Sequence, residues 1–446
     1  MSKLKYSGIE WIGDIPKKWE IKSLKNVCSG FNNGCSNEQL QFGISCFPVT
    51  RIETISTGKI NYDKVGYVES IKASFKLNKN DFLISNINSI EYLGNCAKYE
   101  GDKNLYHGMN LLRIIPNKIN SNYLFYYLKS QIFKTYMQTY CKPAINQASV
   151  SATNIKSMKI TIPSDKEQKL IANFLEEKTT NLNNILFDLN KQIELLTSYK
   201  KSIITETVIG GLNKNVKMVA SGFNWAKEVP AHWDVTKKIK SLFDFSNGLP
   251  ITKADLIENG IPVISYGQIH SKTNKGTFIN SSLIRFVDEK YLKQNRSSIV
   301  KEGDFIFADT SEDIDGCGNC VYVDANELLF AGYHSIILRS KYSNQNKYLA
   351  YLFLTDNWRS QIRSKVYGVK VFSVTQKILK EAKIILPPEN EQKEIVDYLD
   401  KKCEQIDKII EEKQTQIEKI EEYKKSVIYE YVTGKKRVEG AEELYG

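Results

Sequence analysis

The sequence predicts an α+β protein with a pseudo-twofold internal repeat, in which two globular mixed α/β domains are separated by two long antiparallel coiled-coil helices. Three observations predict this class. The second half of the 446-residue chain repeats motifs of the first half in the same order. Each half closes with about 45 residues in which apolar side chains recur at seven-residue spacing. The rest of each half consists of short apolar runs between turn residues, which is typical of strands.

The internal repeat rests on three pairs of motifs. The segment WIGDIPKKWEI from Trp11 matches WAKEVPAHWDV from Trp225, with both tryptophans and the proline in register. Further on, IPSDKEQKLIANFLEEK from Ile162 matches LPPENEQKEIVDYLDKK from Leu386. Finally, SYKKSIITETVIGG from Ser198 matches EYKKSVIYEYVTGK from Glu422. Self-similarity at a large fixed offset indicates that one half of the chain is a diverged copy of the other.

The pattern of apolar and turn residues along the chain divides it into five parts. Runs such as DFLIS, GIPVISY and DFIFAD predict short strands, and the segments from Ser121 and from Asn344 have apolar residues at helical spacing. We therefore assign residues 1–160 and 213–385 to two globular domains, each with its leading Trp segment. Residues 161–212 and 386–434 are assigned to the two long helices, and residues 435–446 to a C-terminal tail.

The long helices are predicted from an apolar seam. In the first copy the seam is formed by Leu175, Leu182, Leu189, Leu196 and Ile203, and in the second by Leu399, Ile406, Ile420 and Val427, with Lys413 as one polar interruption. We expect a second seam at Ile171, Ile185, Ile193 and Tyr199, and at Ile395, Ile409, Ile417 and Tyr423. About 45 residues make a rod of about 65 Å. Because a domain lies between the copies, we expect them to pair antiparallel within the chain; the alternative is that each helix folds onto its own domain.

The charge of the chain is unevenly distributed. The whole chain carries +11, with 62 basic and 51 acidic residues. Residues 165–209 contain six lysines and seven acidic residues, and residues 389–433 contain eight lysines and thirteen acidic residues. The two helices are therefore acidic, and about +17 remains for the other segments. A basic excess on two similar domains favours contact with duplex DNA; a solvated basic surface without a partner is the alternative.

Several classes of protein are excluded or disfavoured. Hydrophobic residues make up 41% of the chain, which excludes wholesale disorder. No run of about 18 apolar residues is present and the first residues lack the apolar core of a secretory signal, so we expect a cytoplasmic protein without membrane contact. The eight cysteines are expected to be reduced. Cys317 and Cys320 form a single CxxC without a second ligand pair, so we predict no metal site and expect both in a strand-rich core.

The sequence lacks several common catalytic motifs. The chain has no GxxxxGK[ST] loop, no GxGxxG after a strand and no NPPY or DPPY tetrapeptide. The segment PSDKEQK at Pro163 superficially resembles a nuclease metal site, but its copy PPENEQK at Pro387 has no matching aspartate. Glu167 and Glu391 within these segments are better explained by capping and dipole complementarity at the start of a helix. We therefore predict no catalytic residues in this chain.

The three repeated motifs resemble those of the specificity subunit of type I restriction–modification systems. The resemblance covers essentially the whole chain, although WAKEVPAHW lacks the Ile-Gly that follows the first Trp in WIGDIPKKW. It implies two target-recognition domains that each read one half of a bipartite DNA sequence, with the helices as a ruler between them. It also implies a non-catalytic subunit without a cofactor of its own, which recruits two methyltransferase subunits and restriction/translocase subunits. Those partners are expected to use S-adenosylmethionine, ATP and Mg. The alternatives are a stand-alone two-reader regulatory protein and an enzyme hidden in divergent motifs.

Candidate DNA-contacting residues come from turn-rich segments with side chains that can bond to phosphates or base edges. In the first domain they are Arg51, Asn86, Asn88, Tyr92, His107, Asn110, Lys142, Asn146 and Gln147. In the second domain they are Tyr266, Gln268, His270, Arg296, Thr310, Ser311, Tyr333, His334, Lys365 and Lys370. A surface or structural role is the alternative for each; Asn110 and His334, which align across the repeat after a glycine, are favoured. Trp11, Trp19, Trp225 and Trp233 are expected in the core, with partner contact as the alternative.

Overall fold

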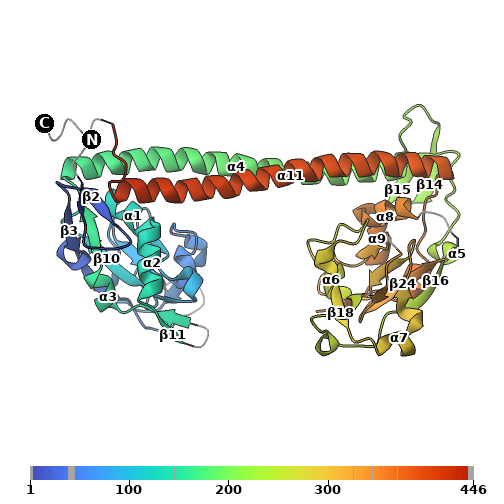
Figure 1. The fold of residues 1–446 in the computed structure, drawn as a ribbon, viewed down its shortest axis with the longest axis horizontal. Coiled ribbons are helices and arrows are strands. Elements are labelled where there is room, and N and C mark those ends of the chain that lie inside the picture. Colours follow the sequence, from blue (N-terminus) through green and yellow to red (C-terminus); the bar gives the residue numbers. More distant parts are fainter. Residues whose placement is uncertain are drawn as a thin grey trace. The chain divides into compact units, whose positions relative to one another are not determined.

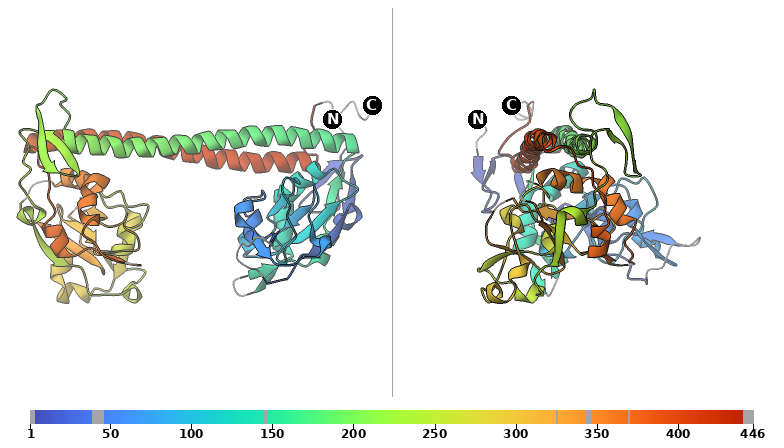
Figure 2. Two further views of the ribbon diagram at one scale, coloured as in Figure 1. Left: turned by 180° about the vertical axis from the view of Figure 1, so that it is seen from behind. Right: turned by 90° about the vertical axis from the view of Figure 1, so that its right-hand side faces the viewer.

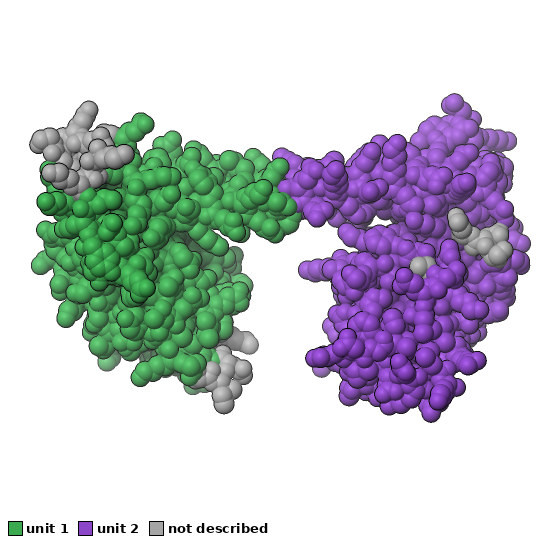
Figure 3. Space-filling model, viewed as in Figure 1, with its two compact units in different colours: residues 1–190, 414–446 green, residues 191–413 purple. Residues whose placement is uncertain are grey.

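The computed structural model describes residues 4–38, 46–144, 147–324, 326–342, 346–368 and 370–439. The chain forms two compact units (Figure 3): unit 1 comprises residues 1–190 and 414–446, and unit 2 comprises residues 191–413. Each unit therefore combines one globular domain with part of each long helix. No helix in these described ranges is both long enough and apolar enough to cross a bilayer.

Unit 1 contains thirteen named strands and three short helices among its described residues. The strands are β1 (Leu4–Tyr6), β2 (Asp14–Pro16), β3 (Glu20–Ser23), β4 (Cys28–Asn33), β5 (Phe47–Val49), β6 (Gly66–Val68), β7 (Phe82–Ile84), β8 (Ile87–Asn88), β9 (Cys96–Lys98), β10 (Leu112–Pro116), β11 (Lys142–Ala144), β12 (Gln147–Ser149) and β13 (Lys159–Ile162). The helices are α1 (Ser121–Lys129), α2 (Gln131–Thr139) and α3 (Ala152–Ser157).

Unit 2 repeats this order with additions. Its described strands are β14 (Met218–Phe223), β15 (Ala226–Pro230), β16 (Phe243–Asn247), β17 (Ile261–Ile264), β18 (Arg285–Val287), β19 (Ile299–Val300), β20 (Phe305–Ala308), β21 (Thr310–Ser311), β22 (Cys320–Tyr322), β23 (Leu329–Ala331), β24 (Ser335–Ser340) and β25 (Phe372–Ser373). Its short helices are α5 (Ile239–Leu242), α6 (Tyr266–Ile269), α7 (Tyr291–Gln294), α8 (Lys347–Leu354), α9 (Asp356–Arg363) and α10 (Gln376–Lys380).

The sheet topology confirms the internal repeat. A four-stranded antiparallel sheet has the order β4-β10-β7-β9 in unit 1 and β16-β24-β20-β22 in unit 2. The helix pairs α1–α2 and α8–α9 follow the second strand of this order in each copy (Figure 1). Unit 2 also has a second four-stranded sheet, β18-β17-β23-β19, in which β17 and β23 are parallel. In unit 1 the β5-β6 pair is extended in the same order by bridges from Tyr106 to Val49, which is parallel, and to Lys76, which is antiparallel. The copies therefore share both layers, and the second layer is more regular in unit 2.

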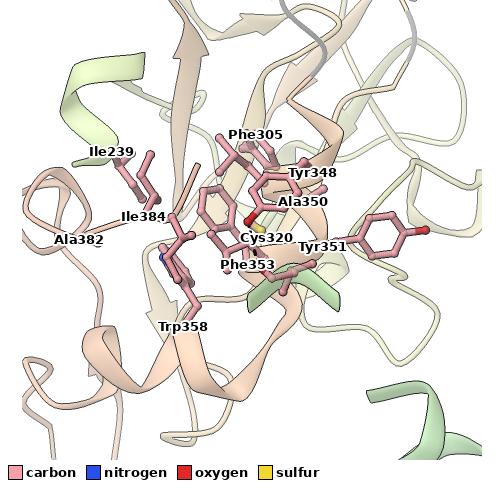
Figure 4. Packing of buried hydrophobic residues seen from close by; sticks show 14 of the residues in the cluster. Ile239, Phe305, Cys320, Tyr348, Ala350, Tyr351, Phe353, Trp358, Ala382 and Ile384 are labelled. Carbon is pink, nitrogen blue, oxygen red and sulfur yellow. Dashed lines mark hydrogen bonds between the residues drawn. The ribbon is translucent and has the colours of Figure 1, made fainter. Parts of the chain in front are cut away.

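The core of each unit lies between the repeated sheet and its helix pair. In unit 2, Phe305 and Cys320 from the sheet pack against Tyr348, Phe353 and Trp358 from α8 and α9 (Figure 4). Both cysteines of the CxxC are buried in this cluster, as expected for small apolar residues in a strand-rich core, and burial raises the pKa of the Cys320 thiol to about 12.

The four motif tryptophans do not all lie in the core. Trp19, Trp225 and Trp233 are buried, as expected. Trp11 was expected in the core as well, but its side chain is 36% exposed and only its edge contacts Tyr136, with the ring centroids 6.3 Å apart.

The long helices α4 (Asp165–Gly210) and α11 (Glu389–Val432) pack together and run antiparallel (Figures 1 and 2). In unit 1, Lys424 Nζ donates to Asn183 Oδ1 at 2.5 Å. In unit 2, Lys200 Nζ lies 2.7 Å from both carboxylate oxygens of Asp407. From the first contact to the second, the residue number rises along α4 and falls along α11, so the two helices are antiparallel. The expected intrachain pairing is therefore confirmed.

Burial confirms the first seam and half of the second. Among the first-seam residues Leu175, Leu182, Leu189, Ile203, Leu399, Ile406 and Val427 are buried, and Leu196 and Ile420 are partly buried. The expectation for the second seam is confirmed at Ile171, Ile395 and Ile417, which are buried, and at Ile193, which is partly buried. It was wrong at Ile185, Tyr199, Ile409 and Tyr423, which are 41–55% exposed. Next to Ile185 and Ile409, the following residues Leu186 and Ile410 are the partly buried ones.

Candidate nucleic-acid interface

Each domain is fixed to the helix pair by the same two hydrogen bonds. Trp19 Nε1 donates to Glu167 Oε2 at 2.9 Å, and Trp233 Nε1 donates to Glu391 Oε2 at 3.0 Å. These bonds join the repeated Trp motif to the repeated EQK motif at the start of α4 and of α11. The glutamates therefore hold the tryptophans, a role that capping arguments from the sequence did not identify.

The second repeated hydrogen bond joins each domain to the C-terminal end of a long helix. The Tyr123 hydroxyl donates to the Val432 carbonyl at 3.1 Å, and the Tyr348 hydroxyl donates to the Val208 carbonyl at 2.8 Å. Carbonyls in the last turn of a helix have no partner within the helix. The Tyr348 hydroxyl satisfies the Val208 carbonyl, and the Val432 carbonyl accepts from both the Tyr123 and the Thr161 hydroxyls. Each domain consequently binds the start of one long helix and the end of the other.

Tight packing at these junctions explains the glycine that ends α11. Gly434 has φ +73°, and a Cβ added there would lie 2.4 Å from Pro16 Cδ. Only glycine combines this left-handed backbone with so close an approach.

A small sheet at the same place in each domain gathers several of the candidate residues. In unit 1 the hairpin β11-β12 pairs with β8, and Ala148 lies opposite Asn88. Asn88, Lys142 and Gln147 thus belong to one three-stranded sheet, on which the Lys142 and Gln147 side chains are exposed. In unit 2 the strand β21, which contains Thr310, pairs with β25 in the corresponding position. The repeat therefore presents the same strand pairing twice, with different side chains.

In unit 2 the candidates form a cluster beside this strand pair. The Tyr266 ring makes edge-on contacts with the rings of His270, Tyr333 and His334, with centroids 6.2, 5.6 and 5.4 Å away. His270 Nε2 lies 2.8 Å from the Thr310 carbonyl oxygen. His334 is exposed, has φ +52°, and its Nδ1 lies 3.3 Å from Asp309 Oδ1. Five predicted residues from three sequence segments therefore converge.

In unit 1 Arg51 and Asn110 are brought together. Both are exposed and line one pocket of about 150 Å³. Asn110 lies two residues before β10 and His334 lies one residue before β24. The two residues expected to correspond across the repeat thus occupy the same turn before equivalent strands.

Three candidates are buried, and the structure gives them internal roles. Asn86 Nδ2 donates to the Val150 carbonyl at 3.2 Å, and Ser311 is buried within β21, where it pairs with Phe372 of β25. His107 is fully buried with Nε2 2.8 Å from the Leu111 carbonyl oxygen, and burial lowers its pKa to about 4. Buried side chains offer little surface to DNA, so burial disfavours the base contacts predicted for these three residues.

The remaining candidates are scattered. Tyr92 and Arg296 are exposed in two short 3-10 helices, Ile90–Tyr92 and Arg296–Ser298. Lys365 and Lys370 are exposed after α9, and Asn146 lies outside the described residues. Gln268 is partly buried, and its Oε1 accepts the Ser265 N–H at 3.2 Å, which caps α6.

Sequence reasoning missed one strongly exposed aromatic residue. The Tyr367 side chain is 87% exposed and lies two residues after Lys365, beyond the end of α9. Tyr140, which is also exposed, lies two residues before Lys142, just beyond the end of α2. An aromatic residue close to a lysine just after a helix is the signal that could have identified these positions.

In the described ranges, no group of three or more His, Cys, Asp or Glu residues is placed to hold a metal ion. Two repeated domains on an antiparallel helix pair, each with polar side chains on or beside a small exposed sheet, are the architecture of a two-module binding protein.

Comparison with known proteins identifies the family. Residues 16–195 and 230–421 match the type I restriction modification DNA specificity domain, and the chain belongs to this family. It is 33% identical to the putative type I restriction enzyme MjaX specificity subunit of Methanocaldococcus jannaschii over 96% of each chain. It is 23% identical to the EcoKI specificity subunit of Escherichia coli K12 over 46% of each chain. The protein is thus a specificity subunit, the non-catalytic component of a type I restriction–modification system that assembles with modification and restriction subunits.

Solved structures share the fold. A chain from a study of complex assembly and conformational transition of the type I R-M system superposes with a TM-score of 0.69, at 14% identity and over 94% of this chain and 98% of that one. The HsdS subunit from Thermoanaerobacter tengcongensis gives a TM-score of 0.50 over the same shares. At this identity the similarity concerns the fold alone.

Proposed function

We propose that this chain reads a bipartite DNA sequence, with one half read by the domain of unit 1 and the other by the domain of unit 2. The observation that supports this most directly is the repeated strand pairing, β8 with β12 and β21 with β25. Equivalent backbone frames with different side chains are what two readers of unlike half-sites require. The basic excess outside the helices provides attraction to phosphates that does not depend on sequence.

The contacts divide into two kinds. Lys142, Lys365 and Lys370 are exposed on turns or strand edges and suit phosphate contacts that fix the register on the duplex. Asn110, Gln147 and His334 present amide or imidazole groups, which form directional hydrogen bonds with base edges in the major groove. Tyr367 adds an exposed aromatic ring beside two of the lysines.

The same proposal includes two methyltransferase subunits docked on the helix pair. Ile185 and Ile409 are 46% and 41% exposed, and Tyr199 and Tyr423 are 55% and 48% exposed. Both pairs are equivalent positions of the repeat, 224 residues apart. Exposed apolar side chains at equivalent places fit two identical partners, each docked on one copy. S-adenosylmethionine, ATP and Mg are then used by the methyltransferase and restriction/translocase partners, and the complex works on cellular DNA in the cytoplasm.

Docking is tested by counting partners. The variants Ile185→Glu and Ile409→Glu change exposed residues, so the chain should still fold. Each single variant should bind one methyltransferase subunit per chain and the double variant none, as measured by native mass spectrometry of the purified complex. If both single variants still bind two partners, the docking surface proposed here is wrong. If no methyltransferase binds the unmodified chain, the stand-alone regulator is favoured.

DNA reading is tested by exchange of one domain. Residues 1–160 are replaced by the corresponding segment of a family member with a different target, in a strain that carries the complete system, and modified adenines are mapped genome-wide. We expect one half of the recognised sequence to change and the other half to persist, and the reciprocal exchange of residues 213–385 is the matched control. A change in both halves after either exchange would contradict the assignment of one half-site to each domain.

A further inference from the structure

A lysine-lined pocket of about 420 Å³ lies in unit 1, where α1 faces α4 and α11. Its lysines come from three separate elements: Lys59 from a turn before β6, Lys129 from the end of α1, and Lys424 and Lys425 from α11. Its other polar walls are Tyr126, Glu176, Thr179, Thr180, Asn183 and Glu421. None of the reading residues proposed above lines it.

The positive charge in this pocket is only partly balanced. Within the described residues, none of the four lysines lies within 4.0 Å of a carboxylate oxygen. Lys424 Nζ donates instead to the neutral Asn183 side chain at 2.5 Å. Lys129 Nζ lies 4.3 Å from the centroid of the Phe125 ring. Glu176 is engaged by the Tyr126 hydroxyl, which donates to it at 2.7 Å.

The lysines are close enough to act on one another. Burial, followed by the Lys129 ammonium, lowers the pKa of Lys424. Burial also lowers the pKa of Lys129, and the Lys59 ammonium lowers it further. Ammonium groups held together in a half-open pocket repel each other, and a bound anion relieves that repulsion.

The second copy of the repeat provides an internal control. The position of Asn183 corresponds to Asp407, and the position of Lys424 corresponds to Lys200. In unit 2 this pair is an ion pair, with Lys200 Nζ 2.7 Å from both oxygens of Asp407. The place of Lys129 is taken by Leu354, which follows from the alignment of Tyr123 with Tyr348. Lys275 Nζ also lies 3.6 Å from Asp407 Oδ2 in unit 2. One copy therefore has a carboxylate between its lysines, whereas the other has an amide at that position and Lys129 in the place of Leu354.

We propose that this unit 1 pocket binds a phosphate group. Lysine ammonium groups and the hydroxyl of the exposed residue Thr180 are suitable donors to phosphate oxygens. The Phe125 ring is covered by Lys129, so the pocket recognises the phosphate and not a stacked base. The phosphate comes either from the DNA backbone or from a free polyphosphate anion, and only the DNA source rests on the proposed reading function.

The test uses Asn183→Asp, which gives unit 1 the carboxylate that unit 2 already has and keeps every lysine. The matched control is Asp407→Asn, the reverse change at the equivalent position. In the first arm, pyrophosphate binding to the full chain is measured by calorimetry. If the source is a free anion, Asn183→Asp should weaken binding roughly tenfold, as expected for one charge-assisted hydrogen bond, and Asp407→Asn should not weaken it.

In the second arm, DNA affinity of the assembled modification complex is measured over a range of salt concentrations. If the source is the DNA backbone, Asn183→Asp should lower the slope of log affinity against log salt by about 0.9 and leave the recognised sequence unchanged. The pocket proposal is overturned if Asn183→Asp changes neither pyrophosphate binding nor the salt slope, or if Asp407→Asn has the same effect. A complex that shows no sequence preference would refute the reading function while the pyrophosphate arm still tests the pocket.

Discussion

The helix pair makes a quantitative prediction about the spacing of the two half-sites. Deletion of residues 189–195 from α4 and of residues 411–417 from α11 removes one heptad from each helix. The deleted segments lie between the contacts Asn183–Lys424 and Lys200–Asp407, so both contacts are retained. Seven residues return the apolar seam to the same side of the helix, which preserves the packing of the pair.

The size of the effect follows from helix geometry. Seven residues at 1.5 Å each shorten the pair by about 10 Å. DNA rises about 3.4 Å per base pair, so the spacer between the half-sites should become about three base pairs shorter. The half-site sequences should stay the same because the deletion touches neither domain.

The assay is genome-wide mapping of modified adenines in a strain with the complete system and the shortened chain. The control is insertion of one heptad at the same two places, which should lengthen the spacer by about three base pairs. A spacer that keeps its length in a modifying complex, or half-sites with new sequences, would refute the assignment of spacing to the helices and reading to the domains.

Three further predictions concern single residues. Tyr348→Phe leaves the buried Val208 carbonyl without its donor and should lower the free energy of unfolding by about 1 kcal/mol, measured by urea denaturation. The pKa of His107 is about 4 in the folded chain against 6.5 in the unfolded one, so the unfolded state binds more protons between these values. Stability should therefore fall by about 3 kcal/mol as pH drops from 6.5 to 4, and His107→Gln should flatten this dependence in thermal unfolding at several pH values. His334→Ala should cost about 1–3 kcal/mol of binding and relax one position of one half-site, whereas Lys370→Gln should weaken all sequences alike and reduce the salt slope by about 1, measured by binding titrations.

The candidate site divides into what was predictable and what was not. Asn110 and His334 were placed correctly in equivalent turns because a glycine and a following strand mark those turns in both copies. The burial of Asn86, His107 and Ser311 was not predictable, since it depends on strands and loops that are distant in sequence. A polar residue in a turn-rich segment has the same local signature whether the turn lies at the surface or folds inward.

The sequence by itself determined the duplication, the two long helices, their antiparallel pairing and the family. These features follow from regular spacing and repetition along one dimension, so they are visible without any knowledge of contacts. Only the tertiary structure decided that the helix pair exposes Ile185 and Tyr199 to solvent. It also decided that Glu167 and Glu391 accept hydrogen bonds from tryptophans. Likewise, it decided that Lys424 contacts the Asn183 amide and has no ionic partner there. Each of these features depends on tertiary contacts between side chains that are distant in sequence. Those contacts, rather than position in the chain, set the free energies of burial and of pairing.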